Sequence, residues 1–288
     1  MSKAMSMDFL RPMTWAEALA AKAADPEARP ILGGTDVMVE LNFDRSRPSA
    51  LLDLTAIPEL AEWELRDGVV RLGAGVPYSR IITELGDLLP GLAIASRTVG
   101  SPQIRNRATV GGNLGSASPA GDAHPALLAA GAEVEVESVR GVRIIAVDEF
   151  FLGPKRSALQ PGELIRAIGI PVTGGPQQFS KIGTRNAMVI AVCSFGIALH
   201  PAQRRVGTGI GSAAPTPLRA HAAEEFLGAE LDWDGPLDRA VANRFGELVA
   251  AAASPIDDVR GTAAYRRHAL SVLARRTLTW SWEEYRCV

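Results

Sequence analysis

Two glycine-rich turns constrain the fold of this chain more than any other feature of its sequence. The first is Leu32-Gly33-Gly34-Thr35-Asp36, and the second is Thr109-Val110-Gly111-Gly112-Asn113. Because glycine has no Cβ, such turns can direct backbone N–H groups into a concave cradle and let a ligand approach closely. Two cradles of the same chemistry suggest one shared anion, such as the pyrophosphate of a dinucleotide. The alternative is a pair of unrelated turns.

Composition and charge exclude several classes of protein. The chain has 288 residues, of which 47% are hydrophobic and 22% charged, as expected for one large or two ordinary globular domains. Its formal net charge of −2 gives no support to a nucleic-acid or anionic-membrane partner. No apolar run approaches the ~20 residues of a membrane span, and the first residues lack the apolar core of a signal peptide. We therefore expect a protein without a membrane span.

The cysteines and histidines indicate no disulfide or metal framework. The two cysteines, Cys193 and Cys287, favour a reducing, cytoplasmic location. An iron–sulfur cluster generally needs four protein ligands, mostly cysteine, so this chain does not supply one alone. The four histidines lack the spacing of a zinc site, and we expect each of them on the surface or in a loop: His124, His200, His221 and His268.

The turn signals divide the chain into two domains. Thr173-Gly174-Gly175-Pro176 is the best linker, so we predict a first domain at residues 1–175 and a second at 176–288. The first domain would have sub-lobes at about 1–56 and 57–175. Its expected helices and strands include a helix capped by Thr14, helices at 36–43 and 125–130, and strands at 30–32, 50–54 and 69–73. Residues 148–154 are expected to form a helix followed by a turn.

The second domain is predicted to be a three-stranded sheet followed by helices. Its strands are expected at 178–182, 189–199 and 205–212, with the last two antiparallel. Its helices are expected at 218–227, 237–252 and 262–279, with Thr216 as the N-cap of the first. The whole chain is thus expected to be α+β.

A third glycine pattern, Gly73-Ala74-Gly75, is not a Rossmann fingerprint. Tyr78 occupies the place of the third glycine, and no acidic residue follows at the distance that such a site requires. We interpret this segment as the end of a strand before a helix.

The two glycine turns belong to a longer pattern that resembles a known family. Ile31–Val37 looks like the first FAD loop of the flavoprotein subunit of molybdenum hydroxylases, the xanthine dehydrogenase and carbon monoxide dehydrogenase family. Ser101–Leu114 resembles the second FAD loop, and Ala117–Asp122 fits its continuation. Later segments at 150–165, 181–188 and 211–219 are similar to further family motifs in the same order. The resemblance covers nearly the whole chain and is strongest to the FAD subunit of bacterial xanthine dehydrogenases.

The resemblance implies a fold, a cofactor and partners. It implies the two-domain FAD-binding fold of the PCMH/vanillyl-alcohol-oxidase type, in which loops rather than a Rossmann helix hold the pyrophosphate. The chain would be an FAD-carrying electron-transfer subunit. A large subunit would carry the molybdopterin cofactor, a small subunit would carry 2Fe-2S clusters, and the assembly would be a dimer of heterotrimers. Electrons would leave to an external acceptor, which could be NAD, oxygen or a quinone.

The resemblance also assigns cofactor contacts and no catalytic residue or metal ligand. The FAD contacts that it implies are Ile31, Leu32, Gly33, Gly34, Thr35, Asp36, Val37, Val99, Gly100, Thr109, Gly111, Gly112, Asn113, Gly115, Ser116, Asp122, Ile165 and Lys181. Asp122 would accept from ribityl hydroxyls, with a helix N-cap as its alternative role. Lys181 would be a basic contact, or else a solvated strand residue. Arg105 and Arg107 are interpreted as structural or interface residues.

One departure from the family pattern concerns the electron acceptor. Met188 and Val189 stand where the family often has an acidic residue near the open face of the flavin. Two other functions remain open at this point. One is a self-sufficient flavin reductase of the related fold, which would need its own acid or base. The other is a nucleotide-binding scaffold without flavin.

Overall fold

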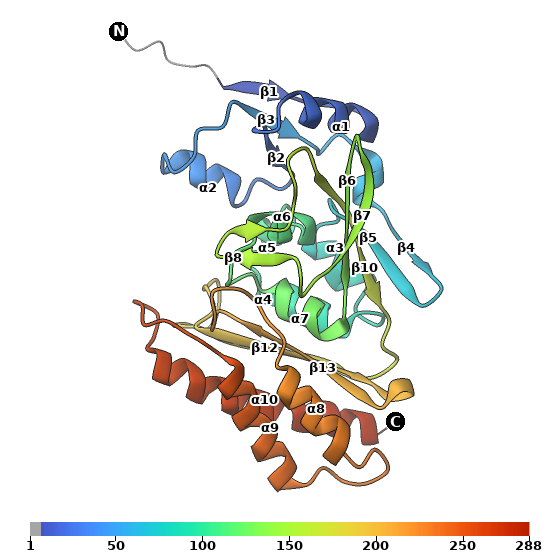
Figure 1. Ribbon diagram of the computed structural model, residues 1–288, viewed down its shortest axis with the longest axis vertical. Helices are drawn as coiled ribbons and strands as arrows, with labels where there is room; N and C mark the ends of the chain where they lie inside the picture. The colour runs from blue at the N-terminus through green and yellow to red at the C-terminus, as the bar shows by residue number, and fades with distance from the viewer. Residues whose placement is uncertain (1–6, 288) are drawn as a thin grey trace.

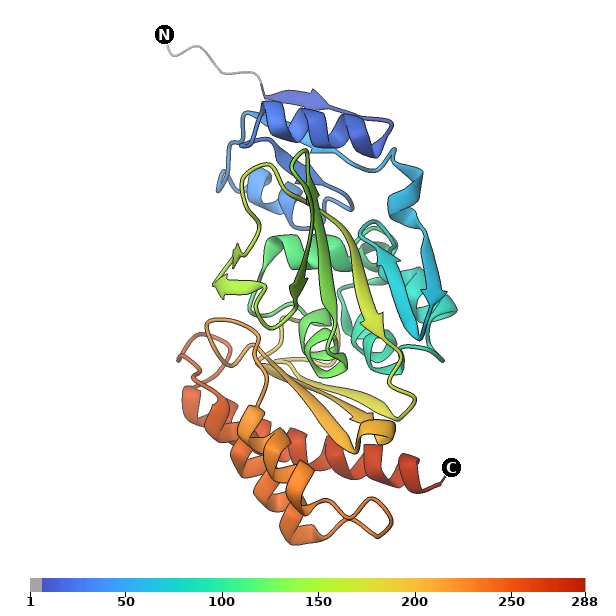
Figure 2. The ribbon, with the colours of Figure 1, turned by 45° about the vertical axis from the view of Figure 1, so that its right-hand side comes forward.

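The chain forms three layers that follow one another from the N-terminus to the C-terminus. The computed structural model describes residues 7–287. Figures 1 and 2 show a small N-terminal sheet at the top, a larger sheet with helices in the middle, and a helix-backed sheet at the bottom. No helix within residues 7–287 is long and apolar enough to cross a membrane.

The N-terminal lobe, residues 8–53, is a parallel sheet in the order β1-β3-β2 with two helices. Thr14 caps the first helix as predicted, because its hydroxyl accepts from the Glu17 N–H at 3.2 Å while the Glu17 carboxylate accepts from the Thr14 N–H. The elements are β1 (Asp8–Leu10), α1 (Trp15–Ala24), β2 (Arg29–Ile31), α2 (Val37–Asn42) and β3 (Ala50–Asp53).

The middle layer is an antiparallel sheet in the order β4-β5-β10-β6-β7. A 3-10 turn, η1 (Pro58–Ala61), leads into it. The strands are β4 (Trp63–Arg66), β5 (Val69–Gly73), β6 (Glu133–Ser138), β7 (Gly141–Ala146) and β10 (Leu164–Pro171), with a small hairpin of β8 (Phe151–Gly153) and β9 (Arg156–Ser157). The helices are α3 (Tyr78–Glu84), α4 (Pro90–Thr98), α5 (Pro102–Arg105), α6 (Val110–Ser116) and α7 (Ala123–Ala130).

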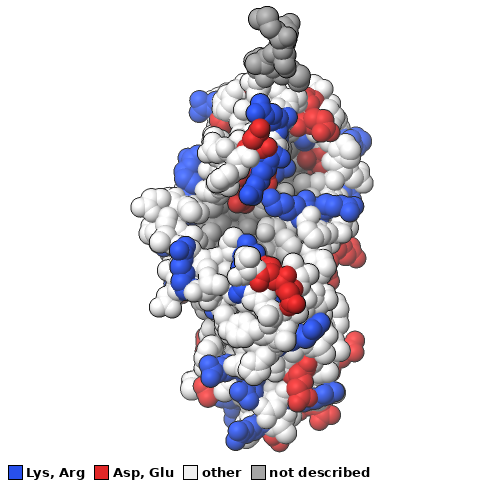
Figure 3. All heavy atoms as spheres, turned by 90° about the vertical axis from the view of Figure 1, so that its left-hand side faces the viewer, with Lys and Arg blue, Asp and Glu red and all other residues white. Residues whose placement is uncertain are grey.

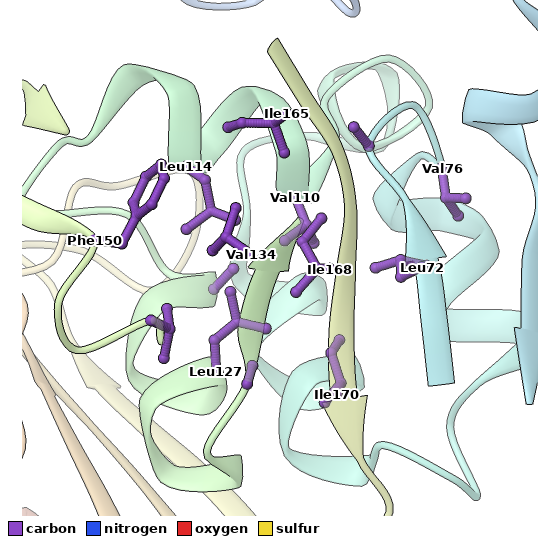
Figure 4. Close-up of a cluster of buried hydrophobic side chains, with 14 of the residues drawn as sticks. Leu72, Val76, Val110, Leu114, Leu127, Val134, Phe150, Ile165, Ile168 and Ile170 are labelled. Carbon is purple, nitrogen blue, oxygen red and sulfur yellow. The ribbon is translucent and has the colours of Figure 1, made fainter. Parts of the chain in front are cut away.

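The core of this layer fixes the helix that carries the second glycine turn. Val110 and Leu114, one turn apart on α6, are buried together with Ile165 and Ile168 of β10 (Figure 4). Burying aliphatic side chains of this size contributes about 1.5–3 kcal/mol each. The opposite side of α6 is therefore left facing away from the core.

The C-terminal layer is an antiparallel sheet in the order β11-β12-β13 with three helices on one face. Its elements are β11 (Gln177–Ile182), β12 (Cys193–His200), η2 (Pro201–Gln203), β13 (Arg205–Gly211), α8 (His221–Glu230), α9 (Arg239–Ala252) and α10 (Ala263–Arg286). Helix α7 of the middle layer packs on the other face of this sheet. The contact is close, since a Cβ at Gly196 would lie 2.7 Å from the Pro125 carbonyl oxygen. Every residue of α7 is buried as a result.

Several boundaries differ from the sequence prediction for identifiable reasons. Residues 189–192 are an irregular segment, so the predicted strand at 189–199 begins only at Cys193. The first C-terminal helix begins at His221 with Ala220 as its N-cap, because the segment before it bridges to β13 through Leu218 and Ile210. Residues 151–153 are a strand rather than part of a helix and turn, because Phe151 pairs with Ser157.

The prediction that every histidine lies at the surface or in a loop is wrong for two of the four. His124 lies in α7 and is fully buried, with its ring 4.6 Å from that of Phe151. His200 ends β12 and is also buried, with its Nε2 3.2 Å from the Ala129 carbonyl oxygen. Both rings lie where α7 packs between the two sheets, a contact that sequence spacing does not show.

Candidate cofactor site

A cavity of about 780 Å³ lies between the N-terminal lobe, the middle layer and a loop of the C-terminal layer. Its volume is within the usual range of cofactor sites. Figure 3 shows the corresponding hollow below the N-terminal lobe, with Lys and Arg side chains near its rim. Every residue that the sequence predicted as a cofactor contact lines this cavity except Lys181.

The first glycine turn contacts the segment that leads into the second turn, and both turns line the cavity. A Cβ on Gly33 would overlap the Arg107 carbonyl and lie 2.9 Å from the Ala108 nitrogen. Only glycine therefore lets the first turn approach the segment that leads into the second. Gly34 has a φ of +75°, a left-handed conformation that side chains disfavour. The fold thus brings together two turns that are far apart in the sequence.

The second turn is the first turn of helix α6 rather than a free loop. Thr109 is its N-cap, and the Thr109 Oγ1 accepts from the Gly112 N–H at 2.9 Å. A Cβ on Gly111 would lie 2.5 Å from the Ala74 carbonyl oxygen, so this glycine is needed for packing against the end of β5. The second glycine turn is therefore held in a short helix, Val110–Ser116, and not in a free loop.

Gly112 and Gly115 face the cavity from the same helix. A Cβ on Gly112 would meet only the Thr109 hydroxyl, at 3.2 Å, and one on Gly115 only the tip of Ile165, at 3.9 Å. Both glycines are exposed and line the cavity. A Cβ at Gly112 would require a shift of the Thr109 hydroxyl by a few tenths of an ångström, and no backbone atom excludes a side chain at either position. The absence of side chains there keeps one face of α6 open to a ligand.

Asp122 and Lys181 form a buried ion pair behind the cavity wall. The Lys181 Nζ lies 2.6 Å from the Asp122 Oδ2 and 3.3 Å from the Thr98 carbonyl oxygen. Both side chains are less than a tenth exposed. Lys181 is thus neither a solvated strand residue nor part of the cavity lining, and it contacts Asp122 instead.

Asp122 itself lines the cavity and keeps one oxygen free. Burial raises the pKa of its carboxyl, and this effect outweighs the opposite effects of Lys181 and Thr98. Its Oδ1 is buried and has no hydrogen-bond partner within residues 7–287. Asp122 occupies the N-cap position of α7 without a side-chain cap bond, so its alternative role as a capping side chain is not observed.

Other orphaned polar atoms lie close to Asp122. The Asn113 Oδ1 and the His124 Nδ1 are buried without partners, and a Cβ on Gly121 would lie within 3 Å of both. Buried acceptors of this kind are costly unless a ligand or water satisfies them. Since Asn113 and Asp122 both line the cavity, they fit a ligand that carries hydroxyl or N–H groups.

Arg29 and Lys155 line the cavity and were missed by the sequence reasoning. Glu40 of α2 pairs with Arg29 at 3.2 Å and with Lys155 of the β8–β9 turn at 2.9 Å. Lys155 holds the pKa of the Glu40 carboxyl below its usual value. These pairs join α2 to the hairpin across the cavity. No local signal reveals them, because the three charges come from separate parts of the chain.

The side toward the C-terminal layer is apolar. Met188, Val189 and Ile190 line the cavity, and Met188 and Ile190 are about half exposed. Arg185 folds back onto its own loop, where its guanidinium donates to the Ala187 and Met188 carbonyls. The positions where the family often carries an acidic residue therefore present apolar side chains. Within residues 7–287, no group of three or more His, Cys, Asp or Glu side chains is placed to hold a metal ion.

Comparison with known proteins agrees with this geometry. Residues 5–173 match the family described as the FAD binding domain in molybdopterin dehydrogenase. Residues 178–281 match the CO dehydrogenase flavoprotein C-terminal domain.

Curated relatives match over nearly their whole length. The chain is 32% identical to the carbon monoxide dehydrogenase medium chain of Afipia carboxidovorans, covering 95% of this chain and 96% of that one. It is 30% identical to the nicotine 6-hydroxylase medium subunit of Paenarthrobacter nicotinovorans, with 96% and 97% covered. It is 28% identical to the xanthine dehydrogenase FAD-binding subunit of Escherichia coli O157:H7, with 94% of each covered.

Solved structures show the same fold. A chain of the reconstituted CO dehydrogenase from Oligotropha carboxidovorans superposes with a TM-score of 0.89 at 28% identity, covering 97% of this chain and 98% of that one. A chain of the carbon monoxide dehydrogenase from Hydrogenophaga pseudoflava also gives 0.89, at 25% identity, with 96% and 98% covered. The α+β fold with a three-stranded C-terminal sheet is thus confirmed.

Proposed function

The chain belongs to the family of FAD-binding medium subunits of molybdenum hydroxylases, and from this premise we propose that it is the electron-transfer subunit of such a complex. It would take electrons from the iron–sulfur clusters of a partner, hold them on FAD, and pass them to NAD, oxygen or a quinone. FAD supplies the redox chemistry when it is bound.

One observation carries the proposal. Both glycine turns line one cavity, where Gly112 and Gly115 leave the surface of α6 open and where Asp122 is also part of the lining. We propose that the pyrophosphate is held by backbone N–H groups of the first turn and by those at the start of α6 that the Thr109 cap does not use. The free Oδ1 of Asp122 would accept from a ribityl hydroxyl. Leu32, Val99 and Ile165 would contact the apolar parts of the cofactor. Lys181 would not contact the cofactor itself. It would neutralise the charge of Asp122, with which it forms an ion pair.

The remaining parts of the proposal concern assembly and specificity. The domain division at 175/176, a dimer of heterotrimers and a cytoplasmic location are included in it. Relatives are named for xanthine, nicotine and carbon monoxide, so the substrate would be chosen by the molybdenum-bearing partner and not by this chain.

The test is the identity of the flavin and of what purifies with it. Protein isolated from its native source should be yellow, release FAD on heating, and carry iron and molybdenum in associated subunits. FAD without iron or molybdenum would instead favour a self-sufficient flavin reductase. FMN, with a single phosphate, or a colourless protein would contradict the proposal.

A further inference from the structure

A second concave site lies on the C-terminal layer, in a groove of about 690 Å³ between α9 and α10. Four arginines line this arginine groove: Arg239 from α9, and Arg275, Arg276 and Arg286 from α10. Glu283 is the one acidic side chain in its lining. The groove is therefore strongly basic, although the whole chain is slightly acidic.

The groove arginines differ from most other arginines of the chain. Most arginines outside the groove are paired with carboxylates, as Arg244 is with Glu247 at 2.9 Å and Arg219 with Glu224 at 2.6 Å. Within residues 7–287, none of the four groove arginines lies within ion-pair distance of a carboxylate. Arg275 donates to the Asn243 side-chain oxygen at 3.1 Å. Because this amide is neutral, it does not compensate the positive charge of Arg275. The site therefore favours an anionic occupant.

Trp280 gives the groove an anchor for a polypeptide. It is 49% exposed and lies one helical turn after Arg276, on the same side of α10. Trp282 forms the buried floor, where its indole N–H donates to the Gly235 carbonyl oxygen at 3.2 Å. Tryptophan and arginine are among the residue types most enriched at the energetic centres of protein interfaces.

The length of the groove favours a peptide segment over a small anion. From Arg275 to Arg286 the helix advances roughly 16 Å, at 1.5 Å per residue. An extended segment of about five residues spans that distance, at ~3.3 Å each. A single phosphate or carboxylate would use one arginine and leave the others unpaired. The groove also lies on the helical face of the C-terminal sheet, opposite the face that meets the cofactor-bearing layer (Figure 1).

We infer that this arginine groove docks an acidic segment of a partner subunit, with Trp280 covered in the complex. The inference rests on the proposed function, because that function supplies the partner. The inference adds the place on this chain where a partner subunit docks. It also specifies that the docking segment of the partner is acidic. Charge complementarity of this kind accelerates association and selects the partner.

The experiment compares variants of the groove within the native complex. Arg276→Glu and Trp280→Ser are introduced into the chain in its source organism, and the mass of the purified complex is measured at increasing ionic strength. We expect at least tenfold weaker association for each variant, with the flavin content of the chain unchanged. Arg267→Glu is the matched control, because Arg267 is exposed on the same helix outside the groove.

The possible outcomes separate the inference from the proposed function. Variants that assemble as well as the wild type overturn the inference. A wild-type chain that purifies without partners overturns the proposed function instead. A dimer of the isolated chain that Arg276→Glu disrupts would assign the groove to a second copy. Calorimetric binding of ADP that Trp280→Ser abolishes, with assembly unchanged, would assign it to a nucleotide. Either result would contradict the inference that the groove docks an acidic segment of a partner subunit.

Discussion

At the scale of single residues, adjacent glycines on one helix have different physical roles. Gly111 packs against the Ala74 carbonyl, whereas Gly112 faces the cavity. Overlap with backbone cannot be relieved by a rotamer change, so Gly111→Ala should destabilise the apo-protein by about 1–3 kcal/mol. Gly112→Ala should leave apo-protein stability unchanged or slightly raised, because alanine favours helix. It should nevertheless lower flavin occupancy at least tenfold.

Thermal unfolding of the two apo-variants, together with the ratio of flavin to protein absorbance, measures both effects. Gly228→Ala serves as a control, since a Cβ there would meet nothing within 4 Å and the position is outside the cavity. Full flavin occupancy in Gly112→Ala would show that α6 does not approach the cofactor.

A second prediction at the scale of single residues concerns the buried ion pair of Lys181 and Asp122. Lys181→Met leaves the Asp122 carboxylate buried without its counter-charge, which should cost about 3 kcal/mol at neutral pH. Burial already raises the pKa of Asp122, so the folded protein binds this proton more tightly than the unfolded chain does. The destabilisation is therefore present above the folded-state pKa and shrinks as the pH falls toward the unfolded value of 3.8.

Melting temperatures of the wild type and of Lys181→Met between pH 4 and pH 8 test whether the destabilisation shrinks as the pH falls. The double variant Lys181→Met/Asp122→Asn should recover much of the stability, because no isolated charge remains, but it should retain less FAD than the wild type. A pH-independent loss in Lys181→Met would indicate lost packing and not an unpaired carboxylate.

At the scale of elements, helix α7 is held between two sheets, and its burial makes it sensitive to acid. His124 is fully buried on it, with Nε2 3.3 Å from the Asn113 carbonyl oxygen. Burial lowers the pKa of His124 from 6.5 to about 4. The unfolded chain therefore binds the proton more readily, and stability should fall by up to about 3 kcal/mol as the pH decreases from 6.5 to 4.

His124→Met, which keeps an apolar side chain of similar size, should flatten the acid side of the stability profile. His268→Gln should not, because His268 is exposed on α10. Chemical denaturation at pH 7, 5.5 and 4.5 makes the comparison. The stability of the wild type should fall more steeply with decreasing pH than that of His124→Met. An equal fall would show that the buried His124 does not cause the sensitivity to acid.

At the scale of the whole molecule, the cavity takes its walls from all three layers, so the cofactor should order them together. A ligand that binds only the folded state stabilises it by about 2.7 kcal/mol at a hundredfold excess over Kd. Added FAD should slow amide exchange at 31–37, 110–116 and 188–190 in one step. Helices α9 and α10 provide the internal control, since they do not line this cavity.

FMN lacks the adenylate half and should protect fewer of these segments. Hydrogen exchange followed by mass spectrometry, on apo-protein with and without each flavin, reports every wall in one experiment. Protection confined to a single segment would show that the cavity does not close around the cofactor as a unit.

The local features of this protein could be predicted from its amino-acid sequence alone. The Thr14 capping box follows from side-chain chemistry within one turn. The two glycine turns, the three C-terminal strands and the family follow from motifs that are contiguous in the chain. These features depend on neighbouring residues, so their signals can be found by reading along the chain.

The long-range contacts, in contrast, could be identified only from the folded structure. It placed Gly33 against Arg107, paired Lys181 with Asp122, and buried His124 and His200 beside α7. It also separated the glycines that packing requires from those that the cavity leaves open. The physical reason is that burial and ion pairing depend on which distant segments come into contact. The same hydrophobic pattern along the chain is compatible with several such arrangements. The backbone that overlaps a Cβ, or the carboxylate that neutralises a lysine, lies many residues away in the chain.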